Sequence, residues 1–195
     1  MRAQESGTSA LASVGDTSRS TSPVGGGRQW GRFALGAASS IAVHELAHVV
    51  TAYALGAKPS FGFDGARPTV YSGIVEREEP HKQFLFSSAG LNAQLLLDEA
   101  ILDVPHDRGG AFERGVLAGG LATVAFYVTI GRNAPVSDIT RMAATSGLSR
   151  GQVSLIYGGV SALHAVRIAH LGYFAKLFVA PGPDGELRVG VRGTP

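Results

Sequence analysis

Cysteine is absent from this sequence of 195 residues. Its absence excludes disulfide bridges, thiol catalysis and zinc sites built on thiolates, and it leaves the redox compartment undetermined. Any metal ion held by the side chains of this chain must therefore be bound by His, Asp or Glu.

Charged residues are scarce as well. They make up 16% of the chain, against roughly 25% in an ordinary soluble domain, and the mean hydropathy is positive at +0.15. The formal net charge is only +2, and the basic residues are spread along the chain instead of forming a stripe, which argues against nucleic-acid binding. A single apolar domain, rich in glycine and poor in surface charge, is typical of a compact membrane bundle.

Composition divides the chain into three regions. Residues 1–27 are rich in Ser, Thr and Gly and lack the apolar run of a signal peptide, which predicts a disordered N-terminal tail. Residues 28–180 contain the apolar segments and are expected to form the membrane-embedded domain. Residues 181–195 form a polar C-terminal tail, expected to be an extended strand or a hairpin.

The central region contains four apolar segments of membrane length, at residues 33–57, 83–104, 112–131 and 151–180. As a helix, the first is long enough to cross a hydrocarbon core of roughly 30 Å, and Gly56 supplies its stop signal. In the third, Gly115 and Gly119 have the spacing that lets membrane helices approach closely, although the abundance of glycine explains the pair equally well.

Two shorter elements complete the expected fold. Residues 59–79 alternate aromatic and small side chains around a turn at Asp64-Gly65, which predicts a short β-hairpin near the membrane surface. Ser137 or Asp138 can cap a short amphipathic helix that ends at Gly147. The predicted fold is therefore an all-α, polytopic membrane bundle with about four membrane-length helices, one short helix and a small β-hairpin after the first helix.

His44, Glu45 and His48 are the polar residues near the middle of the first apolar segment. Side chains four residues apart lie on one helix face, so both imidazoles can reach one Zn²⁺ ion. Glu45 can take the proton of a water on that ion. Each ionisable group at mid-bilayer costs about 2.5–3.5 kcal/mol, so three within five residues need a compensating role. We expect His44 and His48 to be zinc ligands and Glu45 to be the general base.

A catalytic zinc site usually has three protein ligands, so a third is needed from another segment. The candidates are Asp98, Glu99, Asp103, Asp138, His164 and His170. Asp138 follows a polar break after an apolar helix, where a carboxylate can face a hydrated pocket. An ordinary helix cap is the alternative role for this residue.

The pattern resembles the site-2 protease family of intramembrane zinc metalloproteases. That family has a His-Glu-x-x-His helix followed by a glycine and a β-hairpin, as at residues 44–48, Gly56 and 59–79. Residues 89–92, Ala-Gly-Leu-Asn, resemble its Ala-Gly-Pro motif without the proline. Residues 133–141 resemble its Asn-x-x-Pro stretch leading to Leu-Asp-Gly-Gly-Arg. The resemblance covers roughly residues 33–145, and it implies Asp138 as the third zinc ligand and membrane-anchored proteins as substrates.

Glu99 is the alternative third ligand. With Asp103 one turn further on, it matches the spacing of another zincin group, in which the glutamate ligates zinc and the aspartate orients a ligand. Asp138 is favoured over Glu99, and one could ligate while the other lines the pocket. Asn92 shares the helical face of Glu99 and can bind a substrate backbone or another helix. His164 and Arg167 more often extend to the interface than bind a ligand.

The leading hypothesis is a multi-pass protein of the cell membrane that hydrolyses membrane-associated protein substrates with zinc, its hairpin adding to a substrate strand. One alternative is a soluble zincin whose apolar helices form a buried core. A second is a non-catalytic membrane protein that binds metal for structure, sensing or transport. Membrane orientation stays open, because arginines and lysines divide almost equally between the two sides.

Overall fold

The computed structural model describes residues 24–65, 67–181 and 187–193. Within these residues the chain forms five α-helices, one 3₁₀ turn and two antiparallel hairpins. In chain order the elements are α1 (Val24–Ala54), β1 (Ser60–Asp64), β2 (Arg67–Tyr71), α2 (Pro80–Asp103), α3 (Ala111–Val128), the 3₁₀ turn Gly131–Asn133, α4 (Asp138–Ser146), α5 (Arg150–His170), β3 (Ala175–Pro181) and β4 (Leu187–Gly193).

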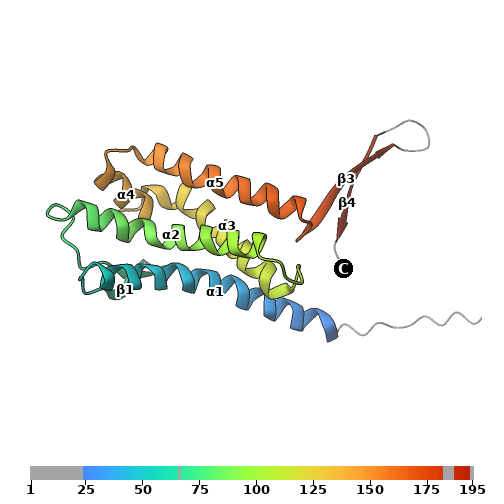
Figure 1. Cartoon of the computed structure of the whole chain (residues 1–195), viewed down its shortest axis with the longest axis horizontal. Helices are drawn as coiled ribbons and strands as arrows, with labels where there is room; N and C mark the ends of the chain where they lie inside the picture. Colours follow the sequence, from blue (N-terminus) through green and yellow to red (C-terminus); the bar gives the residue numbers. More distant parts are fainter. Residues whose placement is uncertain (1–23, 66, 182–186, 194–195) are drawn as a thin grey trace, which may run out of the picture.

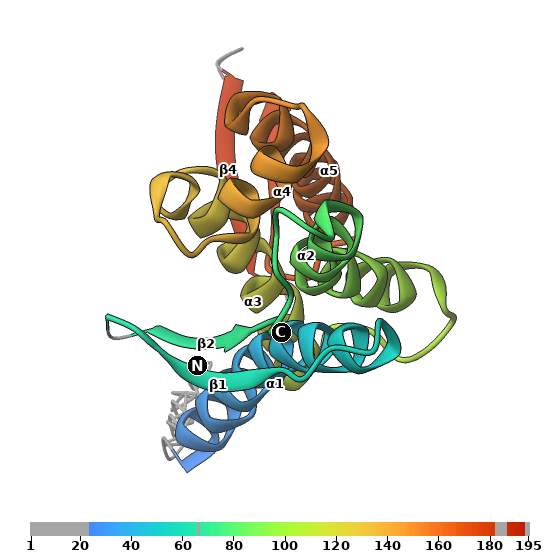
Figure 2. The same cartoon turned by 90° about the vertical axis from the view of Figure 1, so that its left-hand side faces the viewer.

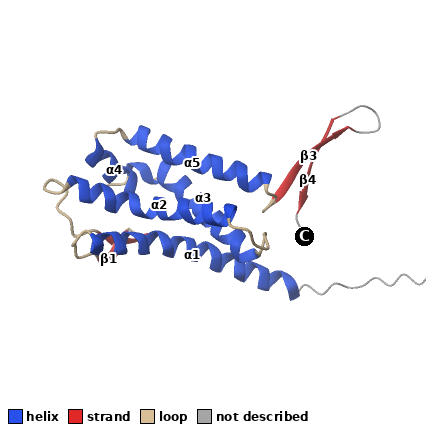
Figure 3. Ribbon diagram, in the orientation of Figure 1, coloured by secondary structure: helices blue, strands red, loops and turns tan. Residues whose placement is uncertain are grey.

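The four long helices lie side by side, and the short helix α4 lies at the end of the bundle where the first hairpin also lies (Figure 1). The β3–β4 hairpin lies beyond the opposite end, and helix dominates the rest of the fold (Figure 3). The prediction of a mostly helical protein with a small hairpin after the first helix is confirmed.

Within the described residues only two helices, and not about four, are long and apolar enough to cross a membrane. They are residues 27–54 of α1 and the whole of α3, judged by length and composition alone. Helices α2 and α5 are also long, with 24 and 21 residues, but their polar side chains lower their hydropathy. The expected number was wrong because it was based on the length of these segments more than on their charges.

Helix α1 begins at Val24, so the last residues of the predicted tail belong to this helix; residues 1–23 lie outside the described part. At the other end, the N–H of Ala57 bonds to the carbonyl of Ala52 at 2.9 Å. Gly56 closes this turn with a φ of +76°, a conformation that glycine adopts without a Cβ penalty. The predicted stop at Gly56 is confirmed.

Small residues let α1 and α3 pack in direct contact. A Cβ at Gly36 would lie 2.0 Å from the carbonyl oxygen of Phe112, and one at Gly115 would lie 2.0 Å from that of Phe33. Gly119 faces the same helix one turn further along. The Gly115–Gly119 spacing therefore serves close helix packing, the first of its two interpretations.

Small apolar clusters position the elements around the site. In the β1–β2 hairpin Ser60 pairs with Tyr71 and Asp64 with Arg67, and the hairpin lies alongside α1 (Figure 2). Val70 anchors the hairpin by packing with Ala52 and Phe86. Helix α4 is anchored by a cluster from four helices: Leu91, Val124, Tyr127, Ile139, Met142 and Val153.

The predicted limits of the short helix agree with the structure, since α4 follows Ser137 and its last turn is closed by Gly147 at a φ of +70°. Helix α5 ends at His170, ten residues before the predicted limit, because 175–181 form a strand. The C-terminal hairpin is thus present but begins earlier than expected, at Ala175.

The bundle buries polar side chains and exposes large apolar ones. Its interior contains Ser40, His44, His48, Gln94, Asp98 and His164. Its surface exposes, among others, Leu35, Ile41, Leu46 and Val50 of α1, Leu96 of α2, and Leu155, Leu163 and Val166 of α5. Phe61 and Phe63 of the first hairpin are also exposed.

Candidate metal centre

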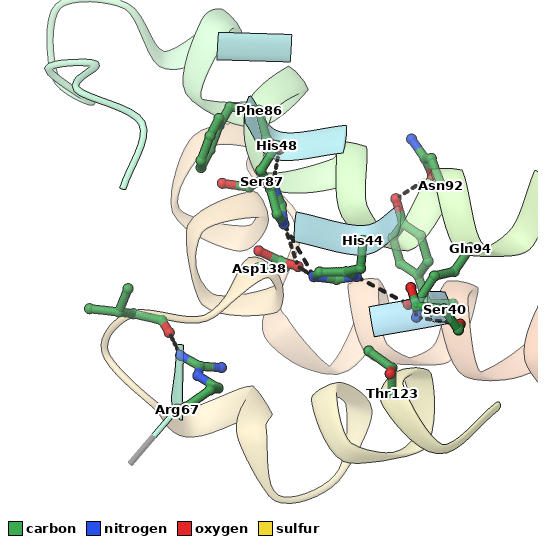
Figure 4. A network of polar contacts seen from close by, with 12 residues as sticks. Ser40, His44, His48, Arg67, Phe86, Ser87, Asn92, Gln94, Thr123 and Asp138 are labelled. Atoms are coloured by element: carbon green, nitrogen blue, oxygen red, sulfur yellow. Dashed lines mark hydrogen bonds and ion pairs between the residues drawn. The ribbon is translucent and has the colours of Figure 1, made fainter. Parts of the chain in front are cut away.

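His44, His48 and Asp138 converge in the interior of the bundle (Figure 4). Only 1% of His44, 3% of His48 and 8% of Asp138 is exposed. The two imidazole Nε2 atoms lie 3.2 Å apart. The Oδ2 atom of Asp138 lies 3.2 Å from Nε2 of His44 and 3.4 Å from Nε2 of His48. This group could hold a metal ion.

The three separations fit a four-coordinate ion. Two ligand atoms on a tetrahedral zinc ion lie about 3.3–3.4 Å apart when each bond is about 2.0–2.1 Å long. The observed distances of 3.2, 3.2 and 3.4 Å match one triangular face of that tetrahedron. A fourth position is left for water or a substrate atom, as in catalytic sites.

Hydrogen bonds from outside the group orient both imidazoles. Nδ1 of His44 lies 3.1 Å from Oε1 of Gln94, and Nδ1 of His48 lies 2.8 Å from the carbonyl oxygen of Phe86. The amide nitrogen of Gln94 donates to Ser40, which directs Oε1 of Gln94 toward His44. Each Nδ1 therefore carries the proton that it donates, and each Nε2 presents a lone pair to the centre.

The chemistry of the centre requires a positive charge. Oδ2 of Asp138 is buried and accepts no hydrogen bond from the described residues. Burial alone raises the pKa of Asp138, but the imidazoles of His48 and His44, when they are protonated, outweigh it and hold the net pKa below its usual range. With both Nε2 atoms unprotonated, the centre contains no such positive charge. Three electron-pair donors thus face one another across little more than 3 Å. Either an extra proton on one imidazole or a metal ion relieves their repulsion.

Gly90 of α2 lies directly against both imidazoles. A Cβ at this position would be 2.5 Å from Nε2 of His48 and 2.6 Å from Nε2 of His44. No side chain fits there while the imidazoles keep their positions. Tyr127 of α3 stacks on His44 at a centroid distance of 5.3 Å and an interplanar angle of 20°. The centre is therefore enclosed by α2 and α3.

Glu45 lies half-buried beside the centre and lines a cavity of about 230 Å³. His48 and Asp138 line the same cavity, together with residues of β2 and the segment that follows it. A glutamate beside two ligand histidines and a solvent-sized space is positioned to exchange protons with a water in that space. Glu45 therefore borders the cavity that reaches the trio, and its role as the general base stays a prediction.

A second cavity of about 550 Å³ approaches the centre along α1 and α3. Its walls are mostly apolar and include Phe33, Ile41, Ala118, Ala122 and Phe126. Glu45, Arg67 and Tyr127 line both cavities. A polar space and an apolar groove therefore meet beside the candidate metal centre.

The other predicted ligands do not join the trio. Nε2 of His164 lies 2.6 Å from Oε1 of Glu99, and Arg167 pairs with both Glu99 and Asp103. Asp98 is buried 3.7 Å from Nδ1 of His164. The structure thus brings Asp138, and not the alternative Glu99, to the two imidazoles. His170 is exposed at the end of α5.

Asn92 is exposed and accepts a hydrogen bond from the hydroxyl of Tyr157 at 2.9 Å, which is a contact between α2 and α5. Its role in substrate binding stays a prediction. Sequence reasoning did not identify Gly90 and Gln94 as parts of the centre. Both lie on the buried face of α2, and a polar Gln94 in an apolar segment was the available signal.

Comparison of the chain with protein-family models, with curated proteins and with solved structures gives no match. We therefore infer the function from the geometry of the centre and from the chemistry of its residues.

Proposed function

We propose that this protein is a membrane-embedded zinc metalloprotease that resembles the site-2 proteases. The observation that carries the proposal is the trio of His44, His48 and Asp138, with nearly equal separations and with Glu45 beside it in an adjoining cavity. Zinc is the ion of choice because two imidazoles and one carboxylate with an open fourth position form its typical catalytic ligand set.

The distribution of apolar residues supports a location in the bilayer. A core helix of a soluble protein is mostly buried, whereas 22% of the most apolar stretch of α1 is buried in this bundle. Large apolar side chains cover the outside of α1 and α5, while ionisable groups lie inside. An apolar surface of this kind is stable against lipid chains, whereas in water it is unfavourable. This contrast favours the membrane hypothesis over a soluble zincin.

The proposed reaction is hydrolysis of a peptide bond. Zinc at this centre would polarise the carbonyl of that bond and lower the pKa of a coordinated water toward about 7. Glu45 accepts the proton of the attacking water and delivers it to the nitrogen of the leaving amine. Gln94 and the carbonyl of Phe86 keep both imidazoles aligned while this transfer takes place.

The two cavities suggest how a membrane-anchored substrate reaches the centre. An apolar segment fits the groove along α1 and α3, and an unwound, extended stretch fits the polar cavity beside β2. Among the described strands β2 pairs with β1 alone, so a substrate strand could add to its second edge.

The test uses the full chain purified in detergent, loaded with zinc and mixed with a set of transmembrane peptides in micelles. Mass spectrometry identifies cleavage products, and elemental analysis measures bound zinc. We expect wild-type protein to cleave at least one peptide, and Glu45→Gln to retain zinc while losing roughly 10²- to 10⁴-fold in rate. His48→Ala loses both zinc and activity.

Glu76→Gln is the matched control, because Glu76 lines the same cavity but pairs with Arg141; this variant keeps most of the activity. Stoichiometric zinc without any cleavage favours the non-catalytic metal-binding alternative. Extraction of the protein from membranes without detergent contradicts the bilayer location.

A further inference from the structure

Arg67 lies where the polar cavity and the apolar groove meet. It begins strand β2, and its side chain lines both spaces together with Glu45 and Tyr127. The side chain is on the side of the trio away from Gln94 (Figure 4).

The guanidinium of Arg67 is held firmly on one side. Nη2 donates to Oδ2 of Asp64 at 2.9 Å and to the carbonyl oxygen of Val136. The central carbon of the guanidinium lies 5.6 Å from the centroid of the Tyr127 ring, within range of a cation–π contact. These contacts fix the plane of the guanidinium and hence the direction of its remaining N–H groups.

The other terminal nitrogen, Nη1, is buried and has no hydrogen-bond partner among the described residues. A buried donor on a charged group is costly to leave unpaired. Three nearby acids are engaged: Asp64 by Nη2, Asp138 by the imidazoles, and Glu76 by Arg141. Glu45 also lines the cavity, but among the described residues it forms no ion pair with Arg67. Because Arg67 lines the polar cavity, a ligand there can supply the missing acceptor once it displaces the atoms that cover Nη1.

The chemistry of this acceptor follows from the donor. Guanidinium N–H groups bind carboxylates and other anionic oxygens strongly and with defined direction. A fixed positive donor beside a hydrolytic centre also stabilises negative charge that develops on a reacting oxygen. Neutral groups gain less from such a donor.

We propose that Nη1 of Arg67 is an anion-binding subsite of the polar cavity, which holds an anionic oxygen of the bound peptide. Two oxygens have this chemistry: the scissile carbonyl oxygen as it becomes negative, and a terminal carboxylate of a substrate with a free C-terminus. The inference rests on the proposed hydrolytic function, because it assumes that a peptide occupies the cavity.

The experiment measures binding, in the zinc-loaded Glu45→Gln background, so that hydrolysis does not interfere. The probes are one apolar peptide and its phosphinic analogue, which carries a negative charge at the scissile position, each with a C-terminal amide or a free carboxylate. Isothermal titration in detergent gives the four dissociation constants. Zinc content and thermal unfolding are measured for every variant to detect misfolding.

Arg67→Gln weakens binding of the anionic probe by roughly 10- to 100-fold, the range for a hydrogen bond to a charged group. The dissociation constant of the neutral peptide amide changes less than twofold. Arg67→Lys restores part of the affinity because it keeps the charge. Arg141→Gln is the matched control: it removes the same charge from the same cavity, but its guanidinium is paired with Glu76, so all four constants stay unchanged.

If Arg67→Gln selectively weakens the binding of both phosphinic probes, Nη1 is assigned to the scissile oxygen. If it selectively weakens the binding of both free-acid probes, Nη1 is assigned to the terminal carboxylate. Equal effects of Arg67→Gln on all four probes, or no effect on any, overturn the subsite. If the wild type cleaves no peptide while Arg67 still selects anionic probes, the hydrolytic function fails and the subsite stands. If the wild type cleaves a peptide but Arg67→Gln does not weaken binding of the anionic probes selectively, the hydrolytic function stands and the subsite fails.

Discussion

A methyl group added at residue 90 would collide with the candidate metal centre. The Cβ of Gly90→Ala would lie 2.5 Å from Nε2 of His48 and 2.6 Å from Nε2 of His44. Ordinary van der Waals contact begins near 3.4 Å, so the imidazoles or helix α2 must move by about 0.9 Å, the difference from 2.5 Å. Bond lengths in a metal site tolerate only about 0.2 Å.

The expected loss of metal affinity follows from how well the metal-free and the metal-bound protein can each relieve the strain from the added methyl group. Without metal, the imidazoles can turn away from the methyl group, although they then lose their bonds to Gln94 and Phe86. With metal bound, they are fixed and the strain remains. Overpacking of this kind costs about 1–3 kcal/mol, which corresponds to a loss of roughly 5- to 140-fold in metal affinity.

Competition with a chromophoric zinc chelator measures this affinity in detergent. Gly159→Ala is the control, because it makes the same change inside helix α5, where no atom lies within 4 Å of the new Cβ; it binds zinc like the wild type. If Gly90→Ala binds zinc within twofold of the wild type, the proposed arrangement of α2 over the imidazoles is wrong.

Three further predictions concern the surroundings of the centre. Gln94→Leu removes the acceptor for Nδ1 of His44 and lowers zinc affinity by roughly 10- to 100-fold, measured by the same competition; unchanged affinity contradicts the orienting role. Gly115→Leu forces α3 away from α1 and lowers the thermal-unfolding midpoint, whereas an equal midpoint refutes close packing there. A hydrogen bond to Glu113 raises the pKa of His106 from its ordinary value of 6.5. The stability from this pair is therefore present below that value and lost as the pH rises through the raised pKa. The difference in midpoint between wild type and His106→Gln should be largest below pH 6.5 and should shrink as the pH rises above it.

The two cavities meet beside Glu45, and this arrangement supports the proposed catalytic role over a purely structural metal site. A structural zinc ion is enclosed by four protein ligands, whereas the trio here is bordered by a cavity of about 230 Å³ that contains the glutamate. The groove along α1 and α3 is mostly apolar, so under the proposed function a lipid-held substrate and the hydrolytic water would meet beside Glu45.

Local sequence patterns were sufficient to predict those features whose geometry depends only on residues close together in the chain. His44 and His48 share a face because they are four residues apart on one helix, and Gly56 ends that helix because it accepts a positive φ. The start of α4 after Ser137 and its stop at Gly147 were likewise evident from turn-forming residues, although no side chain forms a capping hydrogen bond at this start. Residues 175–180 were assigned to a helix in error, since a short apolar run does not distinguish helix from strand.

Residue contacts between segments could not be predicted in the same way. Asp138 and Glu99 both satisfied the requirement for a carboxylate, and only the packing of Ile139 and Met142 into the bundle placed Asp138 beside the imidazoles. Gly90 became part of the centre because α2 presents this residue to α1. Such placement depends on the rotation of each helix about its axis.

By itself, the amino-acid sequence determined a helical protein with a pair of imidazoles and an adjacent glutamate on one helical turn. The tertiary structure alone decided which carboxylate completes the trio, which side chains orient it and which cavities reach it. The physical reason is that hydrogen bonding along one helix sets distances between near neighbours. Distances between helices result instead from the packing of many side chains at once.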